Sequence, residues 1–189
     1  MNSKAKLIVG FVAFLLVIVL ATVGYNYLSQ NYSESEVQNE EVKEPEELQK
    51  APDITIFDDS KNEVKLSEKF GKPVIVNFWA TWCGPCKSEM PAFDKLYKEY
   101  GDKVEFMMVN QTDGARDTME GVKEFIENEG YAFPVYYDVN NEAYTVYGAT
   151  SIPATLFINK DGEIVEGRLG AMDEQTIKGY IEKLLGGNN

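Results

Sequence analysis

The chain contains no histidine and only two cysteines among its 189 residues. Histidine is the usual general base and the commonest metal ligand, so its absence excludes hydrolases of the nucleophile–histidine type. Two cysteines cannot complete a tetrahedral zinc site alone. The sequence also has neither a G-x-G-x-x-G nor a G-x-x-x-x-G-K-[ST] phosphate-binding loop. These absences leave the two thiols as the groups whose chemistry needs an explanation.

Positive charge is also scarce. Lys and Arg number 18 against 31 Asp and Glu, which gives a formal net charge of −13. A protein of that sign repels nucleic-acid phosphates, so we expect no nucleic acid among its partners. The length suits one ordinary domain with an appendage and is too short for two sizeable domains.

The long apolar run of the chain lies at its N-terminus. Leu7 to Val23 is uncharged and almost wholly apolar, and with Gly24 to Leu28 it reaches the roughly 20 residues that an α-helix needs to cross a bilayer. Lys4 and Lys6 precede the run and predict a cytoplasmic N-terminus. We therefore expect residues 1–28 to be an uncleaved signal-anchor, which holds the protein in the cell membrane by a single span with the rest extracytoplasmic. A cleaved signal peptide is the alternative, although the small-residue cleavage pattern is poor.

The remainder of the chain divides by composition. Residues 29–50 are polar and rich in glutamate, which predicts an acidic disordered linker that holds a domain off the membrane. An acidic docking tail is the alternative for this segment. Residues 51–185 have the apolar patterns of a folded domain, and residues 186–189 are expected to be a flexible tail.

Strand and helix patterns alternate through residues 51–185. The expected strands are residues 53–57, 63–66, 73–80, 104–110, 133–138, 154–159 and 163–169. The expected helices begin at the cysteines, at Asp117, at Asn141 and at Asp173, where both aspartates are predicted N-caps. This order predicts an α/β fold with a mixed central sheet flanked by helices. The thiols then lie where a buried strand ends and a helix begins, which is a common place for a site in such folds.

Both thiols belong to the stretch WCGPC, residues 82–86, at the predicted start of a helix. Two cysteines at positions i and i+3 can close a disulfide across one helical turn. Cys83 is expected to be the more exposed thiol, beside N–H groups that carry about half a positive charge and favour the thiolate. Cys86 lies one turn further in, and Pro85 suits the first turn because it needs no N–H partner.

This arrangement indicates thiol–disulfide exchange. Cys83 attacks a partner disulfide, a mixed disulfide forms, and Cys86 resolves it. A purely stabilising cross-link is one alternative, but so short a loop removes little entropy from the unfolded chain. Half of an intermolecular metal site is the other alternative.

Two stretches resemble the thioredoxin superfamily. FWATWCGPC, residues 78–86, is similar to its active-site signature, and TSIPATLFIN, residues 150–159, is similar to the proline strand that faces the disulfide. The resemblance covers about Ala51 to Leu185 and implies a thioredoxin-like fold. It also implies a cis peptide bond between Ile152 and Pro153, since almost only X–Pro bonds accept cis. In that family the backbone of Ile152 would pair with an extended substrate, and Trp82 would shape the docking surface.

Three features are similar to the membrane-anchored TlpA/ResA-like branch of this superfamily. They are the N-terminal anchor, the stretch CGPCKSEMP with Glu89 and a helix-bending Pro91, and an extra helix and strand within residues 111–138. Asn77 stands where cytoplasmic thioredoxins carry a buried aspartate, so the resemblance assigns proton handling to Glu89, three residues after Cys86. A solvated surface glutamate is the alternative for Glu89.

The resemblance implies an extracytoplasmic thiol–disulfide oxidoreductase that reduces oxidised exported proteins, such as apocytochromes c. No flavin or nicotinamide site is recognisable, so no cofactor is expected besides the redox-active Cys83–Cys86 disulfide. Electrons would come from a CcdA-type membrane donor. The Gly84–Pro85 dipeptide between the thiols resembles that of reducing members.

Other functions remain open at this point. One is a net oxidant that forms disulfides in secreted proteins, and another is a chaperone-like binding module without redox turnover. A peroxiredoxin-like peroxidase would need a P-x-x-x-[TS]-x-x-C pattern, which the residues before Cys83 do not form.

Overall fold

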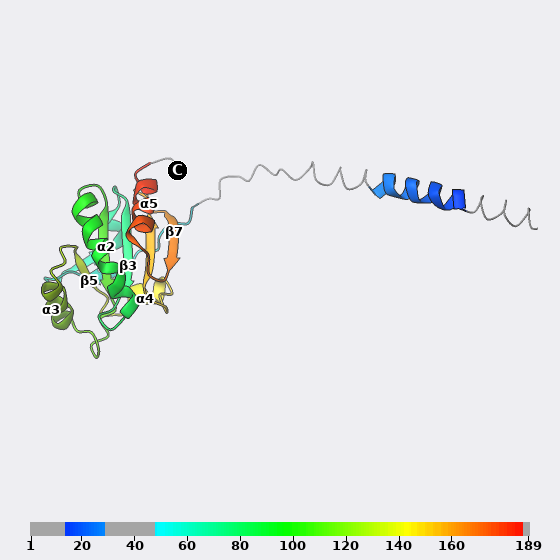
Figure 1. Ribbon diagram of the computed structural model, residues 1–189. Helices are drawn as coiled ribbons and strands as arrows, with labels where there is room; N and C mark the ends of the chain where they lie inside the picture. Colours follow the sequence, from blue (N-terminus) through cyan, green and yellow to red (C-terminus); the bar gives the residue numbers. More distant parts are fainter. Residues whose placement is uncertain (1–13, 29–47, 187–189) are drawn as a thin grey trace, which may run out of the picture. The chain divides into compact units, whose positions relative to one another are not determined.

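The computed structural model describes residues 14–28 and 48–186. The chain divides into two units, Met1–Glu47 and Leu48–Asn189 (Figure 1). In the first unit, residues 14–28 form a helix whose side chains are largely exposed. Within the described residues, no helix combines the length and the apolar character needed to cross a membrane. The rest of the predicted anchor, the linker up to residue 47 and the last three residues of the predicted tail lie outside the described residues.

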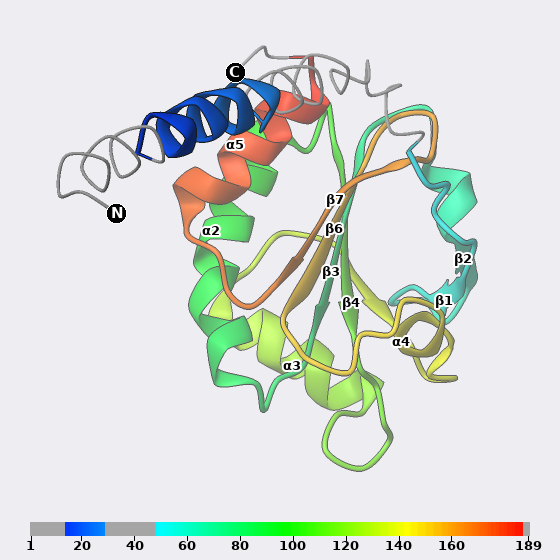
Figure 2. The same cartoon turned by 90° about the vertical axis from the view of Figure 1, so that its right-hand side faces the viewer.

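The second unit is built on a seven-stranded sheet (Figure 2). In chain order the strands are β1 (Thr55–Phe57), β2 (Glu63–Lys65), β3 (Val74–Trp79), β4 (Glu105–Asn110), β5 (Val135–Tyr137), β6 (Ala154–Ile158) and β7 (Ile164–Leu169). Their order across the sheet is β2-β1-β5-β4-β3-β6-β7. Strands β3, β4 and β5 pair in parallel, and every other pairing is antiparallel. The predicted α/β fold with a mixed sheet is confirmed.

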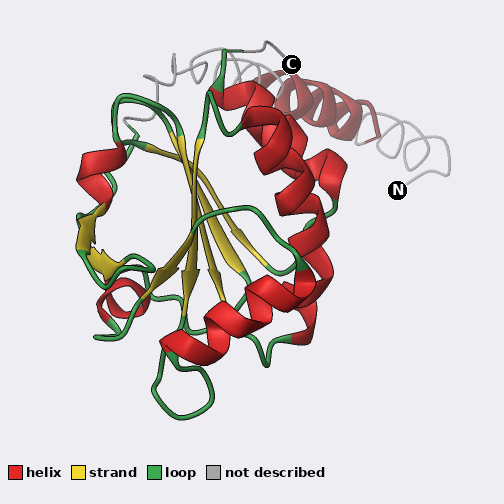
Figure 3. Cartoon of the chain, turned by 90° about the vertical axis from the view of Figure 1, so that its left-hand side faces the viewer, coloured by secondary structure: helices red, strands yellow, loops and turns green. Residues whose placement is uncertain are grey.

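Helices cover both faces of this sheet (Figures 2 and 3). One face carries α2 (Gly84–Tyr100), α3 (Met119–Glu129) and α5 (Glu174–Leu184), and the other carries α4 (Glu142–Val146) and the 3₁₀ turn η1 (Leu66–Lys69). Because both faces are covered, a central strand can be apolar along its whole length.

Strand β3 shows this two-sided burial directly. All six of its residues are buried. Successive side chains of a strand point to opposite faces, so Ile75 and Trp79 join the core under α2 and α5, whereas Val74, Val76 and Phe78 join the core under α4. The cysteines follow shortly after the carboxyl end of β3.

Helix α3 does not begin as the sequence predicts. Thr118 is its N-cap, and the Thr118 side chain accepts a hydrogen bond from the N–H of Gly121. The prediction of Asp117 as N-cap is wrong, because the Asp117 carboxylate binds the loop before Cys83 instead. The predicted cap of α5 is confirmed, since the Asp173 side chain accepts from the N–H of Thr176.

The folded unit includes residues that the sequence places at the end of the linker. The carbonyl of Gln49 accepts from the N–H of Ile164, and Lys50 forms an isolated β-bridge with Glu163. Residues 48–50 therefore run along the β6–β7 hairpin, and the domain begins a few residues before Ala51.

Candidate active site

Cys83 and Cys86 form a disulfide at the first turn of α2. The two Sγ atoms are 2.04 Å apart, and the Cα atoms are 5.3 Å apart. Cys83 is the N-cap of the helix, and its Sγ accepts the N–H of Cys86 at 3.1 Å. Pro85 lies in the first turn, where its missing N–H leaves no intrahelical bond unmade. The disulfide thus lies just beyond the carboxyl end of β3, as the sequence predicts.

The two cysteines differ in accessibility. Cys83 is 5% exposed and Cys86 is fully buried. Trp82, beside Cys83, is exposed. Gly84 is also exposed, and a Cβ added there would meet no atom within 4 Å. Packing within the domain therefore does not require a glycine at this position; the glycine leaves the surface next to Cys83 without a side chain.

The Ile152–Pro153 segment lies against the disulfide. Its peptide bond is cis, as the resemblance implies. The Cys83 Sγ is 3.7 Å from the Ile152 carbonyl oxygen. Strand β6 begins directly after Pro153 and pairs antiparallel with β3, where Ala154 lies opposite Phe78. This strand pairing brings together two motifs that are about 70 residues apart in sequence.

Glu89 lies on the buried face of α2. It is 1% exposed, which contradicts the alternative of a solvated surface residue. Its Oε1 accepts from Asn77 Nδ2 at 2.9 Å, and its Oε2 accepts from the N–H of Met172 at 3.0 Å. Loss of hydration raises the pKa of Glu89 to about 6, although both hydrogen bonds act in the opposite direction. Pro91 lies two residues further along the same helix.

Asn77 links Glu89 to the proline strand. It is the polar residue of β3 and is 1% exposed. Its Nδ2 also donates to Thr155 Oγ1 at 2.9 Å, and Thr155 faces Asn77 in the β3–β6 pairing. Sequence reasoning did not single out Thr155, because strand register across so long a separation cannot be read from one sequence.

The loop between β4 and α3 holds the residues that precede Cys83. Asp117 is 2% exposed. Its carboxylate accepts from the backbone N–H of Thr81 at 2.8 Å, from the Thr81 hydroxyl, and from Asn110 Nδ2 at 2.8 Å. Asp117 therefore holds the chain two residues before Cys83.

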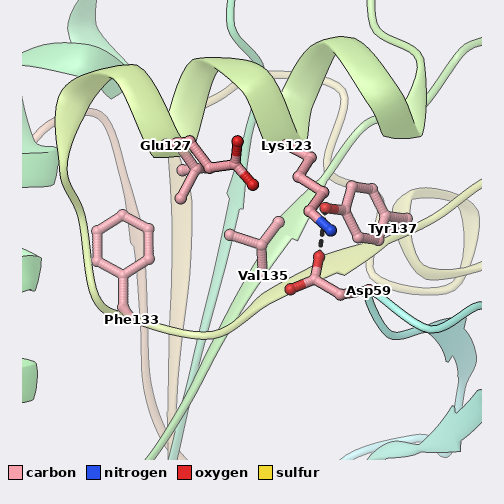
Figure 4. A pocket seen from close by; sticks show the side chains of 7 residues that line it. Asp59, Lys123, Glu127, Phe133, Val135 and Tyr137 are labelled. Carbon is pink, nitrogen blue, oxygen red and sulfur yellow. Dashed lines mark hydrogen bonds between the residues drawn. The ribbon is translucent and has the colours of Figure 1, made fainter.

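Three hollows are present on this unit, and one of them, of about 160 Å³, is lined by residues of β6 and β7 with Phe78 and residues 147–149. A groove of about 340 Å³ approaches the proline segment and is lined by Gln111, Asn141, Tyr144, Thr145, Gly148, Ala149 and Thr150. A smaller cavity of about 80 Å³ lies between α3 and β5, where Tyr137 donates a hydrogen bond to Asp59 (Figure 4). None of these hollows is lined by a cysteine. In the part of the chain that the structure describes, no cluster of three acidic or cysteine side chains is placed to hold a metal ion.

Comparisons with known proteins agree with this geometry. Residues 48–166 match the AhpC/TSA family. Thiol-disulfide oxidoreductase ResA of Bacillus thuringiensis (strain Al Hakam) is 35% identical over 135 residues, which cover 71% of this chain and 76% of the relative. Thioredoxin-like protein YneN of Bacillus subtilis is 34% identical over 171 residues, which cover 89% and 94% of the two chains. The crystal structure of StoA from Bacillus subtilis superposes with a TM-score of 0.61 at 26% identity, over 69% of this chain and 97% of that one. The chain therefore belongs to the AhpC/TSA family, and within it to the thioredoxin-like thiol-disulfide oxidoreductases of the ResA type.

Proposed function

We propose that this domain reduces disulfides in exported proteins through the Cys83–Cys86 dithiol. One observation carries the proposal: Cys83, the more exposed of the two cysteines, caps a helix N-terminus, and its Sγ lies 3.7 Å from the carbonyl oxygen of Ile152. The attacking atom and the proposed docking strand therefore meet at one place on the surface.

The reaction transfers two electrons in two exchanges. The Cys83 thiolate attacks one sulfur of the substrate disulfide, so the substrate S–S bond breaks and its other sulfur leaves as a thiolate. The Cys86 thiolate then attacks Cys83 Sγ, the bond between Cys83 and the substrate breaks, and the second substrate thiol is released. The domain ends in the disulfide form that the structure shows.

Ile152 offers its backbone to a docked substrate. Within the described residues, neither its N–H nor its C=O takes part in a backbone hydrogen bond. An extended substrate segment can pair with such free groups as an added strand does. We propose that the substrate docks here, with Pro153 holding the segment beside the disulfide and Trp82 forming part of the docking surface.

Glu89 supplies a proton carrier behind the disulfide. A carboxyl group with a pKa of about 6 changes protonation close to neutral pH, which suits acid–base catalysis. Glu89 is three residues from Cys86 on α2, so the two side chains are neighbours on the helix. We propose that it takes the proton from the Cys86 thiol and returns one when the disulfide is reduced again.

Re-reduction of the domain needs an external donor of two electrons. We propose a CcdA-type membrane carrier as this donor, no cofactor beyond the cysteine pair, and apocytochromes c among the substrates. Support comes from the resemblance to the ResA type and from the absence of a recognisable flavin or nicotinamide motif.

We also propose that residues 1–28 anchor the protein in the cell membrane, with the domain outside the cytoplasm. The apolar run at 7–23 and the two lysines before it support this topology. Protease added to intact spheroplasts should digest the domain while it remains cell-bound. Protection until lysis would contradict the topology, and release of an intact domain into the medium would favour a cleaved signal peptide.

The activity is tested with a peptide that contains one disulfide, the full chain in detergent, and an excess of a small dithiol as electron source. The wild-type chain should accelerate reduction, and the doubly substituted Cys83→Ala, Cys86→Ala chain should not. Binding without acceleration by the wild type would favour the chaperone-like module. Equilibration with glutathione buffers then gives the reduction potential; a strongly oxidising value would favour the net oxidant.

A further inference from the structure

Arg116 lies over the indole ring of Trp82, with its Cζ atom 3.8 Å from the ring centroid. Trp82 directly precedes Cys83 and is 41% exposed. The chain has only two arginines, Arg116 and Arg168, and a net charge of −13. One of these scarce guanidinium groups therefore lies on the residue that directly precedes the attacking cysteine.

The loop that carries Arg116 is rigidly built. Asp113 Oδ1 accepts the backbone N–H groups of Ala115, Arg116 and Asp117 at 2.8, 2.7 and 3.2 Å. The Asp117 carboxylate in turn binds the N–H of Thr81 at 2.8 Å. The loop and the residues before Cys83 thus form one hydrogen-bonded unit, which holds the guanidinium in place.

Stacking leaves the edge of the guanidinium available. A guanidinium stacks through its flat face, and its N–H donors lie in the plane along its edge. Arg116 Nε donates to Asp113 Oδ2 at 3.2 Å. Within residues 14–28 and 48–186, the two terminal amino groups of Arg116 make no hydrogen bond, and its side chain is 59% exposed.

We infer that Arg116 is a specificity-determining residue that favours substrates with an aspartate or glutamate next to their disulfide. The planar, doubly donating edge of a guanidinium matches the two oxygens of a carboxylate. A partner whose disulfide reaches Cys83 must approach Trp82, and Arg116 covers one face of that ring. The inference rests on the proposed function, since it describes which disulfides the Cys83 thiolate reaches best.

The experiment compares two peptides, each with one disulfide, that differ only by Glu or Gln beside one cysteine. We expect kcat/KM for the wild-type chain to be roughly fivefold higher with the Glu peptide, the upper end for an exposed ion pair, and to lose this preference as salt is added. Arg116→Gln should remove the preference, and Arg116→Lys should keep part of it. Arg168→Gln, at an exposed position of β7, is the matched control and should keep all of it.

Three results would overturn the inference and leave the proposed function standing. They are equal wild-type rates with both peptides, an unchanged preference in Arg116→Gln, and an equal loss of rate with both peptides in that variant, which would mean that Arg116 only positions Trp82. A wild-type chain that reduces neither peptide would instead contradict the proposed function and, with it, this inference.

Discussion

Glu89 and Asp113 are two carboxylates in the same domain whose pKa values are shifted in opposite directions. Glu89 is buried, and loss of hydration raises its pKa to about 6 although Met172 and Asn77 both donate to it. Asp113 lies in an exposed loop, where the backbone N–H of Ala115 and two further backbone donors lower its pKa to about 2. Both groups accept good hydrogen bonds. Access to water therefore decides the sign of the shift.

The contrast separates a reactive role from a structural one. A group that stays ionised at every physiological pH, as Asp113 does, can hold a loop but cannot exchange protons. Glu89, with a pKa of about 6, gains and loses a proton close to neutral pH, which suits acid–base catalysis. The burial of Glu89 is thus a condition for its proposed chemistry.

The largest expected effect is that of Glu89→Gln. This change removes the exchangeable proton and should slow disulfide exchange by up to roughly 10²–10⁴-fold, the range for a lost acid–base group. The measurement is a pH–rate profile of peptide reduction, together with alkylation of the two cysteines as a function of pH. Glu99→Gln, on the exposed side of the same helix, is the control and should keep the wild-type profile.

Stability must be measured alongside this substitution. From the sequence alone, Glu89→Gln is expected to change stability little, because the two side chains have nearly the same shape. In the structure both Glu89 oxygens accept from donors, so the amide of a glutamine would face Met172 N–H or the Asn77 amide with a donor of its own. We expect a loss of about 1–3 kcal/mol for the unpaired buried donor. Profiles of Glu89→Gln and wild type that coincide would show that Glu89 has no part in proton transfer.

The second prediction concerns how the free energy of unfolding depends on pH. The folded pKa of Glu89, about 6, exceeds the ordinary glutamate value of 4.5, so between these pH values the folded state binds more protons than the unfolded state. The free energy of unfolding should therefore fall as pH rises through this window, by about 2 kcal/mol from this group. Asp113 acts with the opposite sign, since its stabilisation is gained as pH rises from about 2 to 3.8.

Urea denaturation of wild type and Glu89→Gln from pH 4 to pH 7 isolates the Glu89 contribution as the change in their difference. The difference should shift in favour of Glu89→Gln as pH rises. A difference that stays constant would mean that Glu89 has an ordinary pKa in the folded protein.

Thr155→Val tests whether the hydrogen bonds around the buried Glu89 carboxylate affect its proton transfer. It removes the acceptor for one amide hydrogen of Asn77, whose other bond orients Glu89. We expect a rate loss of roughly two- to tenfold, as for one lost hydrogen bond, and a displaced pH–rate profile. Thr155→Ser keeps the hydroxyl and should restore both. A valine variant with an unchanged profile would separate Thr155 from proton handling.

Asp113→Asn tests the exposed carboxylate of the comparison and should have the smallest effect on the rate of disulfide exchange. The amide oxygen still accepts backbone N–H bonds, but the charge that strengthens them is lost. Hydrogen exchange at the amides of Ala115, Arg116 and Asp117 should become faster. The pH–rate profile above pH 4 should keep its wild-type shape. A displacement as large as that of Glu89→Gln would remove the distinction between the two carboxylates.

Part of this arrangement is predictable from the sequence. Periodicity and turn residues predict the strands and the helices, because each element has to bury one or two faces. The stretch from Trp82 to Cys86 locates the disulfide, and the Ile152–Pro153 pair locates the cis bond. These are local signals, and the structure confirms them.

The contacts that surround the site are not local. Thr155 faces Asn77 only through the register of β3 and β6, and Met172 reaches Glu89 across 83 residues of chain. Asp117 looks like a helix cap from its neighbours in sequence, but its carboxylate binds Thr81, 36 residues away. Tertiary packing sets each of these contacts, and a single sequence does not reveal it; for Asp117 it overrules the local preference.

The most direct test of the account is to trap partners in the native membrane with each cysteine replaced in turn. Cys86→Ala leaves the attacking thiol without its resolving partner, so mixed disulfides with exported proteins should accumulate on non-reducing gels. Cys83→Ala should give none, because the remaining thiol is fully buried. Accumulation in Cys83→Ala and none in Cys86→Ala would contradict the assignment of Cys83 as the attacking residue.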